Sequence, residues 1–382
     1  MKIHQLSTIL VMILAVACSN INPPDPPKAP SEPYAGNLPI DQIELPEGFA
    51  IDVYAEDVEN ARSMDLSPNG TLFVGTRSKG SVYALQDTDG DMRIDKQYEL
   101  AKKLKLPNGV AFRDGDLYVA EVNRIIKFPD IENNLDNPTF EVIYDEYPTE
   151  THHGWKFISF GPDGKLYVPV GAPCNICESE DEVFASLTRM NADGSDMEII
   201  QHGIRNTVGF TWHPETGDLW FTDNGRDWLG DDIPACELNR ASKDHMHFGY
   251  PYCHQGDLAD PDFGDKKPCS DFTPPVQNLG PHTAPLGLEF VTTSNFPAEL
   301  QSHVLIAEHG SWNRSKKIGY QVSLVKLDGD QAISYEPFAS GWLDKEADEA
   351  WGRPVDIEFL PDGTMLVSDD FANAIYRIYY KG

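Results

Sequence analysis

"ISFGPDGKLYVPVGA", residues 158–172, holds two stretches of alternating apolar residues on either side of a Pro-Asp-Gly turn. Alternation with a period of two is typical of β-strands that bury one face, and Pro-Asp-Gly is a strong turn signal. The segment therefore predicts a β-hairpin. It decides the fold because the same pattern occurs again along the chain.

Five further segments share the pattern of strand, tight turn and apolar strand. They are "MDLSPNGTLFVGTR" from Met64, "VAFRDGDLYVAEVN" from Val110, "FTWHPETGDLWFTDNG" from Phe210, "LEFVTTSNFPAELQSHVLIAEHG" from Leu288 and "IEFLPDGTMLVSDD" from Ile357. Another strand pair follows each copy, and successive copies begin about 45 to 80 residues apart, which suits a four-stranded propeller blade with insertions. The sequence predicts an all-β fold, a six-bladed β-propeller with four-stranded blades.

An early strand is available to close this ring. The segment "FAIDVYAED", residues 49–57, alternates like the others and can pair with the last blade. Closure would remove the open sheet edges that otherwise invite aggregation. A β-sandwich with a second domain would also contain alternating strands, but it gives no reason for one hairpin to occur six times.

The N-terminal region reads as a secretion and anchoring segment. An apolar stretch from Leu6 to Ala17 is too short to span a membrane, and it predicts a signal peptide over residues 1–17. Cys18 directly follows, as in bacterial lipoproteins, so we expect it to carry lipid, with a plain secretory signal as the alternative. Residues 18–40, rich in Pro, Asn and Ser, are expected to form a flexible tether, and residues 41–382 the propeller domain. The expected location is the periplasm or the cell surface.

Charge and cysteine content narrow the partners and the compartment. The chain has 61 acidic and 30 basic residues, which argues against nucleic acid and anionic membrane surfaces as partners, so a membrane contact is expected only through the lipid anchor. In an oxidising compartment Cys253–Cys269 and Cys174–Cys177 are plausible disulfides, with Cys236 left over. The spacing does not fix this connectivity, and metal binding by the C-x-x-C pair is the alternative.

The position of unusual residues within the repeat indicates a ligand site. In a propeller, the loop that enters the innermost strand and the loop that leaves the second strand open on the same face, around the central channel. Most copies place Arg or His just before the innermost strand: Arg62, His152, His153, Arg205, His282 and Arg353. Polar residues also follow the second strands, among them Arg77, residues 223–227, residues 308–314, Asp369 and Asp370. This predicts a cationic cluster at the channel mouth, suited to a multiply anionic ligand.

One loop on this face could bind a cation. The stretch "DNGRDWLGDDIPACELN", residues 223–239, could supply hard oxygen ligands, including backbone carbonyls, to Ca²⁺. It lacks the spacing of an EF-hand. Zinc is less favoured, because the histidines show no tight ligand pattern such as H-E-x-x-H.

Several of these segments together resemble a known family. They are "HHGWKFISFGPDGKLYVPVGAPCNIC" (152–177), "GIRNTVGFTWHPETGDLWFTDNGRD" (203–227), "HGSWNRSKKIGYQV" (309–322) and "GRPVDIEFLPDG" (352–363). From about Ile43 to the C-terminus the chain resembles the PQQ-dependent sorbosone dehydrogenase family, relatives of the soluble quinoprotein glucose and aldose sugar dehydrogenases. The resemblance implies a six-bladed propeller that holds pyrroloquinoline quinone (PQQ) and Ca²⁺ at the top of the channel. The three carboxylates of PQQ would match the predicted cationic mouth.

The resemblance also implies roles for individual residues. His152 aligns with the histidine that acts as general base, whereas His153 falls where relatives vary. Arg205 and Asn206 match an Arg-Asn pair at the quinone. Gly225 and Arg226 occupy the positions whose backbone carbonyls bind Ca²⁺.

Further quinone or substrate contacts follow from the same likeness. Arg353 matches one of two closely spaced arginines that pair with the quinone, and the other position is Trp351 in this chain. The remaining implied contacts are Arg62, His309 and Arg314. In addition, Trp155 and Trp312 lie where they could stack on a quinone or sugar ring, or pack in the core.

The expected function is a PQQ- and Ca²⁺-dependent oxidoreductase. It would oxidise a sugar or a sugar-derived aldehyde, of aldose or sorbosone type, with hydride transfer to the quinone and proton transfer to histidine. A separate cytochrome or quinone would then accept the electrons. Two alternatives stay open: a non-catalytic propeller that binds carbohydrate or protein, and a Ca²⁺-dependent sugar lactonase, whose site would need several acidic side chains at the ion.

Overall fold

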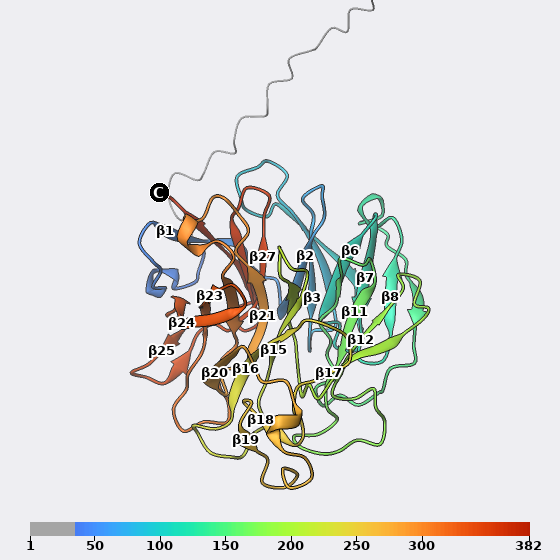
Figure 1. The fold of residues 1–382 in the computed structure, drawn as a ribbon. Coiled ribbons are helices and arrows are strands. Elements are labelled where there is room, and N and C mark those ends of the chain that lie inside the picture. The colour runs from blue at the N-terminus through green and yellow to red at the C-terminus, as the bar shows by residue number, and fades with distance from the viewer. Residues whose placement is uncertain (1–34) are drawn as a thin grey trace, which may run out of the picture.

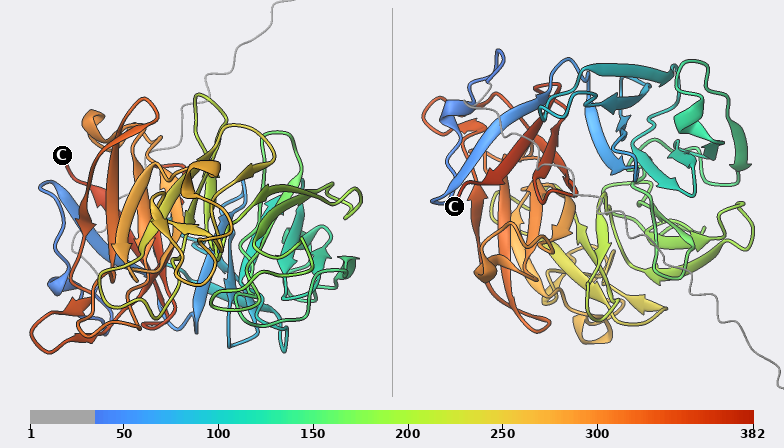
Figure 2. Two further views of the ribbon diagram at one scale, coloured as in Figure 1. Left: turned by 60° about the horizontal axis from the view of Figure 1, so that its bottom comes forward. Right: turned by 90° about the horizontal axis from the view of Figure 1, so that it is seen from above.

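The computed structural model describes residues 35–382, and six sheets of this part of the chain, each with four consecutive antiparallel strands, stand as blades around a central axis (Figures 1 and 2). The predicted six-bladed β-propeller with four-stranded blades is confirmed. The predicted signal peptide, Cys18 and most of the tether lie outside the described residues. Within the described residues, no helix has the length and apolar character needed to cross a membrane.

Blades are numbered here in chain order of their innermost strands. Blade 1 contains β2 (Ala61–Leu66), β3 (Leu72–Thr76), β4 (Val82–Gln86) and β5 (Lys96–Ala101). Blade 2 contains β6 (Gly109–Arg113), β7 (Asp116–Ala120), β8 (Ile125–Phe128) and β9 (Glu141–Tyr144). Blade 3 contains β10 (Ser159–Phe160), β11 (Leu166–Val170), β12 (Ser186–Met190) and β13 (Glu198–His202), with β17 (Met246–His247) added in parallel at its edge.

The second half of the ring follows the same plan. Blade 4 contains β14 (Phe210–Trp212), β15 (Leu219–Asp223), β16 (Ala235–Ala241) and β20 (Gln277–Pro281). Blade 5 contains β21 (Pro285–Phe290), β22 (Val304–Glu308), β23 (Gln321–Asp328) and β24 (Gln331–Ala339). Blade 6 contains β27 (Pro354–Phe359), β28 (Met365–Asp369), β29 (Ala374–Tyr380) and β1 (Phe49–Ala55).

Short elements of secondary structure lie in the loops between these strands. Two small ribbons pair β18 (Cys253–His254) with β19 (Leu258–Ala259) and β25 (Leu343–Asp344) with β26 (Glu349–Ala350). Single 3₁₀ turns occur at Ile40–Gln42, Ile131–Asn133, Cys269–Asp271 and Ala298–Leu300. None of them interrupts a blade.

The first and last strands of the ring lie side by side, as predicted. Strand β1 pairs antiparallel with β29, with Phe49 opposite Tyr380 and Val53 opposite Tyr376 (Figure 2, right). The sixth sheet thus joins the two ends of the described chain, and its register buries Val53 and Tyr376. Ile40, placed in the tether by sequence, is also buried against this part of the core, so the folded body begins slightly before Asp41.

The hydrophobic core is divided among the interfaces between blades. Clusters of buried residues lie between neighbouring blades: Phe73 of blade 1 shares a cluster with Val119 of blade 2, for example, and Leu366 of blade 6 shares one with Val74 of blade 1. The cluster between blades 3 and 4 also includes Leu286 of blade 5 and Val355 of blade 6. The apolar strand residues therefore hold the blades together, while the loops at the channel mouth stay free to carry polar groups.

Two disulfides connect Cys174 to Cys177 and Cys253 to Cys269. Cys236 is a buried free thiol. These are the pairings that the sequence made plausible, and no metal is needed to explain the C-x-x-C pair.

Candidate functional site

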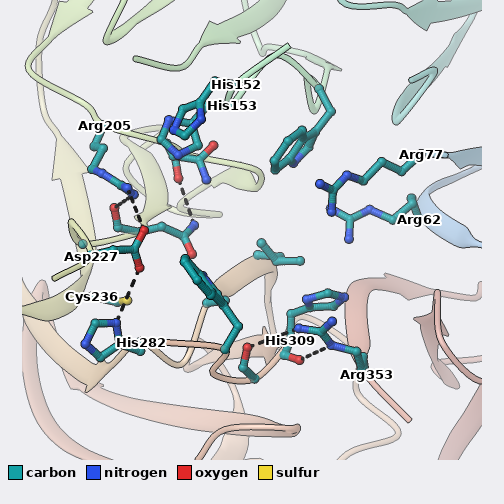
Figure 3. Close-up of a pocket in the computed structure, with 18 of the residues that line it drawn as sticks. Arg62, Arg77, His152, His153, Arg205, Asp227, Cys236, His282, His309 and Arg353 are labelled. Atoms are coloured by element: carbon teal, nitrogen blue, oxygen red, sulfur yellow. Dashed lines mark hydrogen bonds and ion pairs between the residues drawn. The ribbon is translucent and has the colours of Figure 1, made fainter. Parts of the chain in front are cut away.

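A cavity of about 590 Å³ opens at the channel mouth, within the range of small-molecule and cofactor sites (Figure 3). It is lined from blades 1, 3, 4, 5 and 6, mostly by the loops that enter the innermost strands and leave the second strands, with Arg62, Cys236 and Leu286 contributed by the strands themselves. The lining contains Arg62, Arg77, His152, His153, Trp155, Arg205, Asn206, Gly225, Asp227, Cys236, His282, His309, Trp312 and Arg353. Thus four arginines and four histidines converge there, although the chain carries a net charge of −31.

Two of the four arginines are paired with carboxylates. Nη1 of Arg62 lies 3.0 Å from Asp370 Oδ2, and its Nε donates to Asn108 Oδ1 at 2.7 Å. Arg205 Nη2 lies 3.3 Å from Asp227 Oδ2, while its Nε donates to the carbonyl of Asn175 at 2.9 Å. These contacts fix both guanidinium groups in the cavity wall.

The other two arginines form no ion pair with any described residue. Arg77 lies across the cavity from Arg205, and its guanidinium carbon is 3.8 Å from the centroid of the Trp155 ring (Figure 3). Burial, with the nearby charge of Arg62, lowers the pKa of Arg77 to about 10, so the side chain stays charged at neutral pH. Arg353 donates from Nε to the His309 carbonyl at 3.1 Å. Both groups are therefore available to an anionic ligand.

The adjacent histidines differ in how they are held. His152 is exposed to the cavity, whereas His153 is buried, and their ring centroids lie 4.1 Å apart. His153 Nδ1 lies 2.9 Å from the Ala172 carbonyl, which can only accept, so this nitrogen carries the proton and Nε2 keeps a lone pair. A Cβ on Gly171 would lie 2.6 Å from Cβ of His153, so the close approach requires glycine there.

Both rings are uncharged near neutral pH. Partial burial lowers the pKa of His152, and the charge of Arg205 adds to the effect. Burial places the pKa of His153 well below its usual value, again with a contribution from Arg205. Each histidine can therefore accept a proton.

A third histidine is held by a carboxylate on another wall. His309 Nε2 lies 2.7 Å from Asp370 Oδ1, and the same carboxylate pairs with Arg62. Burial alone would raise the pKa of Asp370, but His309 and Arg62 outweigh it and hold that pKa well below its usual range. Burial lowers the pKa of His309 to about 4 in spite of Asp370. Asp370 thus joins blades 5, 6 and 1 at the cavity.

A fourth histidine supports the wall that holds Asp227. His282 Nε2 bonds to the Gly230 carbonyl at 2.8 Å, and its Nδ1 lies 3.8 Å from Asp227 Oδ1. Asp227 raises the pKa of His282. In the lining, Asp227 is the one acidic side chain among the described residues.

The two residues predicted to bind calcium differ in whether they line the cavity. Gly225 lines the cavity, whereas the side chain of Arg226 forms ion pairs with Asp260 at 2.5 Å and Asp262 at 3.3 Å. The backbone carbonyls of Gly225 and Arg226 accept no hydrogen bond from the described residues. Both carbonyls are therefore available to a hard cation.

Of the predicted quinone contacts, the cavity brings together Arg62, Arg205, Asn206, His309 and Arg353. Arg314 lies outside the lining. Its guanidinium bonds to the Asp231 carbonyl and to Asp232 Oδ1, the latter at 3.2 Å. Its contact with a cofactor stays a prediction.

Phase in the repeat was the signal that placed Arg77, Asp227 and His282 at the channel mouth, without an individual role for any of them, and all three line the cavity. Cys236 gave no such signal, because it lies on β16, the third strand of its blade. Burial raises the pKa of this thiol to about 11.

Fold and site together define a six-bladed propeller with a cationic ligand cavity at one end of its channel. The chain belongs to the family described as Domain of unknown function (DUF7133), which matches residues 37–377. An uncharacterized protein of Borreliella burgdorferi is 33% identical over 354 residues, which are 89% of this chain and 91% of that protein.

Solved structures with the same fold include two carbohydrate enzymes. The holo form of the pyranose dehydrogenase PQQ domain from Coprinopsis cinerea has a TM-score of 0.77 at 17% identity, covering 92% of this chain and 99% of that one. A calcium structure of a Trichoderma reesei carbohydrate-active enzyme of family AA12 has a TM-score of 0.77 at 20% identity, covering 88% and 97%. At these identities the likeness establishes the fold. Membership of the sorbosone dehydrogenases stays a prediction.

Proposed function

We propose that the protein is a PQQ- and Ca²⁺-dependent oxidoreductase that oxidises a sugar or a sugar-derived aldehyde, of aldose or sorbosone type. One observation carries the proposal. Arg77 and Arg353 face a cavity with no carboxylate partner among the described residues, in a strongly acidic protein. Two charged guanidinium groups that face a cavity without a partner favour binding of an anionic ligand. PQQ has three carboxylates that could pair with them.

The donor set fits both cofactors. Arg62, Arg77, Arg205 and Arg353 would surround the quinone, Asn206 would donate to it, and the carbonyls of Gly225 and Arg226 would bind Ca²⁺. When bound, PQQ supplies a two-electron acceptor and Ca²⁺ a Lewis acid. The fold neighbours named as a PQQ domain and as a calcium structure support this choice.

The chain's own residues supply the proton chemistry. His152 is exposed in the cavity and uncharged, so it can take the proton of a substrate hydroxyl at a ring nitrogen. His153 packs against it with a fixed tautomer and holds the position of that ring. A separate cytochrome or quinone would then remove the electrons.

The lining of the cavity argues against the two alternative functions, a Ca²⁺-dependent lactonase and a non-catalytic binding propeller. A central Ca²⁺ with several acidic ligands would need carboxylates in the lining, where Asp227 alone is found among the described residues and is already paired with Arg205. A purely carbohydrate-binding or protein-binding propeller would not need two uncompensated arginines.

Reconstitution tests the proposal directly. Protein produced without cofactor is titrated with PQQ, with and without Ca²⁺, and binding is followed by calorimetry. Dye reduction is then measured across aldoses and sorbosone. We expect saturable, Ca²⁺-dependent binding and turnover on at least one substrate. If PQQ does not bind, or binds without supporting turnover on any of them, the proposal is wrong.

Location belongs to the same proposal. We propose that the protein acts in the periplasm or at the cell surface, anchored through lipid on Cys18, and its two disulfides support an oxidising compartment. Labelling cells with a radioactive fatty acid tests the anchor. Equal labelling of the wild type and Cys18→Ser would overturn it.

A further inference from the structure

Two exposed tryptophans meet beside the mouth of the cavity. The exposed fraction is 67% for Trp228 and 65% for Trp312, and their ring centroids lie 5.5 Å apart at an interplanar angle of 87°. Trp312 lines the cavity, and Trp228 directly follows Asp227, which also lines it. Large aromatic side chains left this open are costly in water, so their position at a ligand cavity needs a reason.

The two tryptophans are held in place by contacts between their loops. Arg314 bonds to the Asp231 carbonyl and to Asp232, and the backbone N–H of Ser315 donates to Asp231 Oδ1 at 3.0 Å. These contacts tie the loop after β22, which carries Trp312, to the loop after β15, which carries Trp228. On the second loop, His282 also bonds to the carbonyl of Gly230.

The backbone at Trp228 is itself strained. Its φ is 72°, in the left-handed region that bulky side chains rarely adopt. Such a conformation is unfavourable and persists where neighbouring contacts impose it, often at ligand sites. Trp228 thus lies on a loop that contacts from Arg314 and Ser315 hold in place, and its indole stays exposed.

We propose that Trp228 and Trp312 form a subsite for a pyranose ring, so that the substrate is a saccharide of at least two units. This inference rests on the proposed function, since the reducing-end unit would enter the cavity and the next unit would contact the tryptophans. The C–H faces of a pyranose stack on indole rings, and two rings at a right angle offer a face and an edge to one sugar unit.

The polar surroundings favour a sugar over a protein partner. The side chain of Asp232 is 88% exposed next to Arg314, and Asp231 lies in the same loop, so hydroxyl groups would find acceptors and donors beside the indoles. The core of a protein interface is a broader apolar patch from which charged residues are depleted. Docking of a protein electron acceptor at the tryptophans is therefore the competing outcome of the test.

The test compares saccharide length in the full chain loaded with PQQ and Ca²⁺, with a dye as acceptor. Substrates are glucose, maltose and cellobiose; variants are Trp228→Ala, Trp312→Ala and the double variant. Phe140→Ala, an exposed aromatic on the outer part of blade 2, is the matched control. Calorimetry of maltose and cellobiose binding to the cofactor-free protein gives a second readout, and thermal unfolding verifies that each variant is folded.

We expect each tryptophan variant to lower kcat/KM for the preferred disaccharide about three- to tenfold, through KM, and to weaken its binding in calorimetry equally. Glucose oxidation by Trp228→Ala, whose side chain lies outside the cavity lining, and all activities of the Phe140→Ala control should change less than about twofold, within the usual effect of a surface substitution. If the wild type treats glucose and both disaccharides alike, or if Trp228→Ala loses all substrates equally, the subsite is wrong. A loss seen only when a protein acceptor replaces the dye would also overturn it.

The outcomes separate this inference from the function on which it rests. If no saccharide is oxidised but disaccharide binding depends on the two tryptophans, the proposed function fails and the subsite stands. If glucose is oxidised and the tryptophan variants behave like the wild type, the function stands and the subsite fails.

Discussion

The mouth of the central channel carries basic side chains and its deeper part carries carboxyl groups, on or next to the same inner strands. On β2, Arg62 lies at the mouth and Asp65 further along; Arg353 precedes β27, which carries Asp356 and Glu358. At the mouth, charge is balanced by pairing, as between Arg62 and Asp370. In the deeper part, no cation pairs with the carboxylates among the described residues, and burial instead raises the pKa of Asp65 and Asp356 to about 7.

This difference shows what each end of the channel can do. Buried carboxyl groups that lie near one another favour the protonated form, so they need no cation as a partner. Cations at the mouth are left partly uncompensated, which costs stability unless an anionic ligand binds. The mouth of the channel is therefore the part suited to binding a ligand. The carboxyl groups of the deeper part determine how the free energy of unfolding depends on pH.

The largest effect is expected for substitution of His152 at the channel mouth. His152→Ala should lower kcat about 10²- to 10⁴-fold, the usual contribution of a general base, with PQQ affinity retained. Because burial lowers the pKa of His152 from its usual 6.5, wild-type kcat should hold constant to a pH below that value. Steady-state kinetics across pH, with PQQ binding measured in parallel, tests both statements. A greater loss of turnover in His153→Ala would reverse the assignment of the two residues.

Removing an unpaired cation should have the next largest effect. Arg353→Gln or Arg77→Gln is expected to weaken PQQ binding about 10- to 100-fold, since a hydrogen bond to a charged group contributes roughly 1.5–3 kcal/mol. Arg240→Gln is the matched control, because Arg240 pairs with Asp218 and Asp330 away from the cavity. Calorimetric titration with PQQ measures the difference. Equal affinity in all three variants would contradict an anionic ligand at the mouth.

The deeper carboxylates predict a decrease of stability with pH. Burial, with the nearby charge of Asp356, raises the pKa of Glu289 to about 8 from a usual 4.5. The folded protein then binds more protons than the unfolded chain between these values, so the free energy of unfolding falls as pH rises through about 8. Glu289→Gln should remove part of this fall and raise Tm at pH ~9 by roughly 2–4 °C.

Thermal unfolding at several pH values between about 6 and 9, the range that brackets this titration, checks the effect. Glu299→Gln, at an exposed carboxylate, is the control and should follow the wild type. A wild-type Tm that stays flat or rises with pH over this range would contradict protonated carboxylates in the channel.

The repeat made the fold and much of the mouth predictable. A hairpin that occurs six times requires a ring of blades, and its phase places Arg62, Arg205 and Arg353 on one face before any coordinates are known. The phase could not separate His152 from His153, because their difference depends on the Ala172 carbonyl approaching one ring. Likewise, the contact of Arg62 with Asp370 joins residues 308 positions apart, which only ring closure brings together.

The smallest effect is expected for Arg314, which the sequence placed with the quinone. Its guanidinium is engaged with Asp231 and Asp232 outside the cavity, so it stabilises the loops that present Trp228 and Trp312. Arg314→Gln should therefore change PQQ affinity less than about threefold, below the loss of one charged hydrogen bond, whereas Arg353→Gln exceeds that limit. Titration of both variants with PQQ decides between the two roles. Comparable losses of PQQ affinity in the two variants would show that Arg314 contacts the quinone. A loss confined to disaccharide binding would show that Arg314 acts only on the loops that carry Trp228 and Trp312.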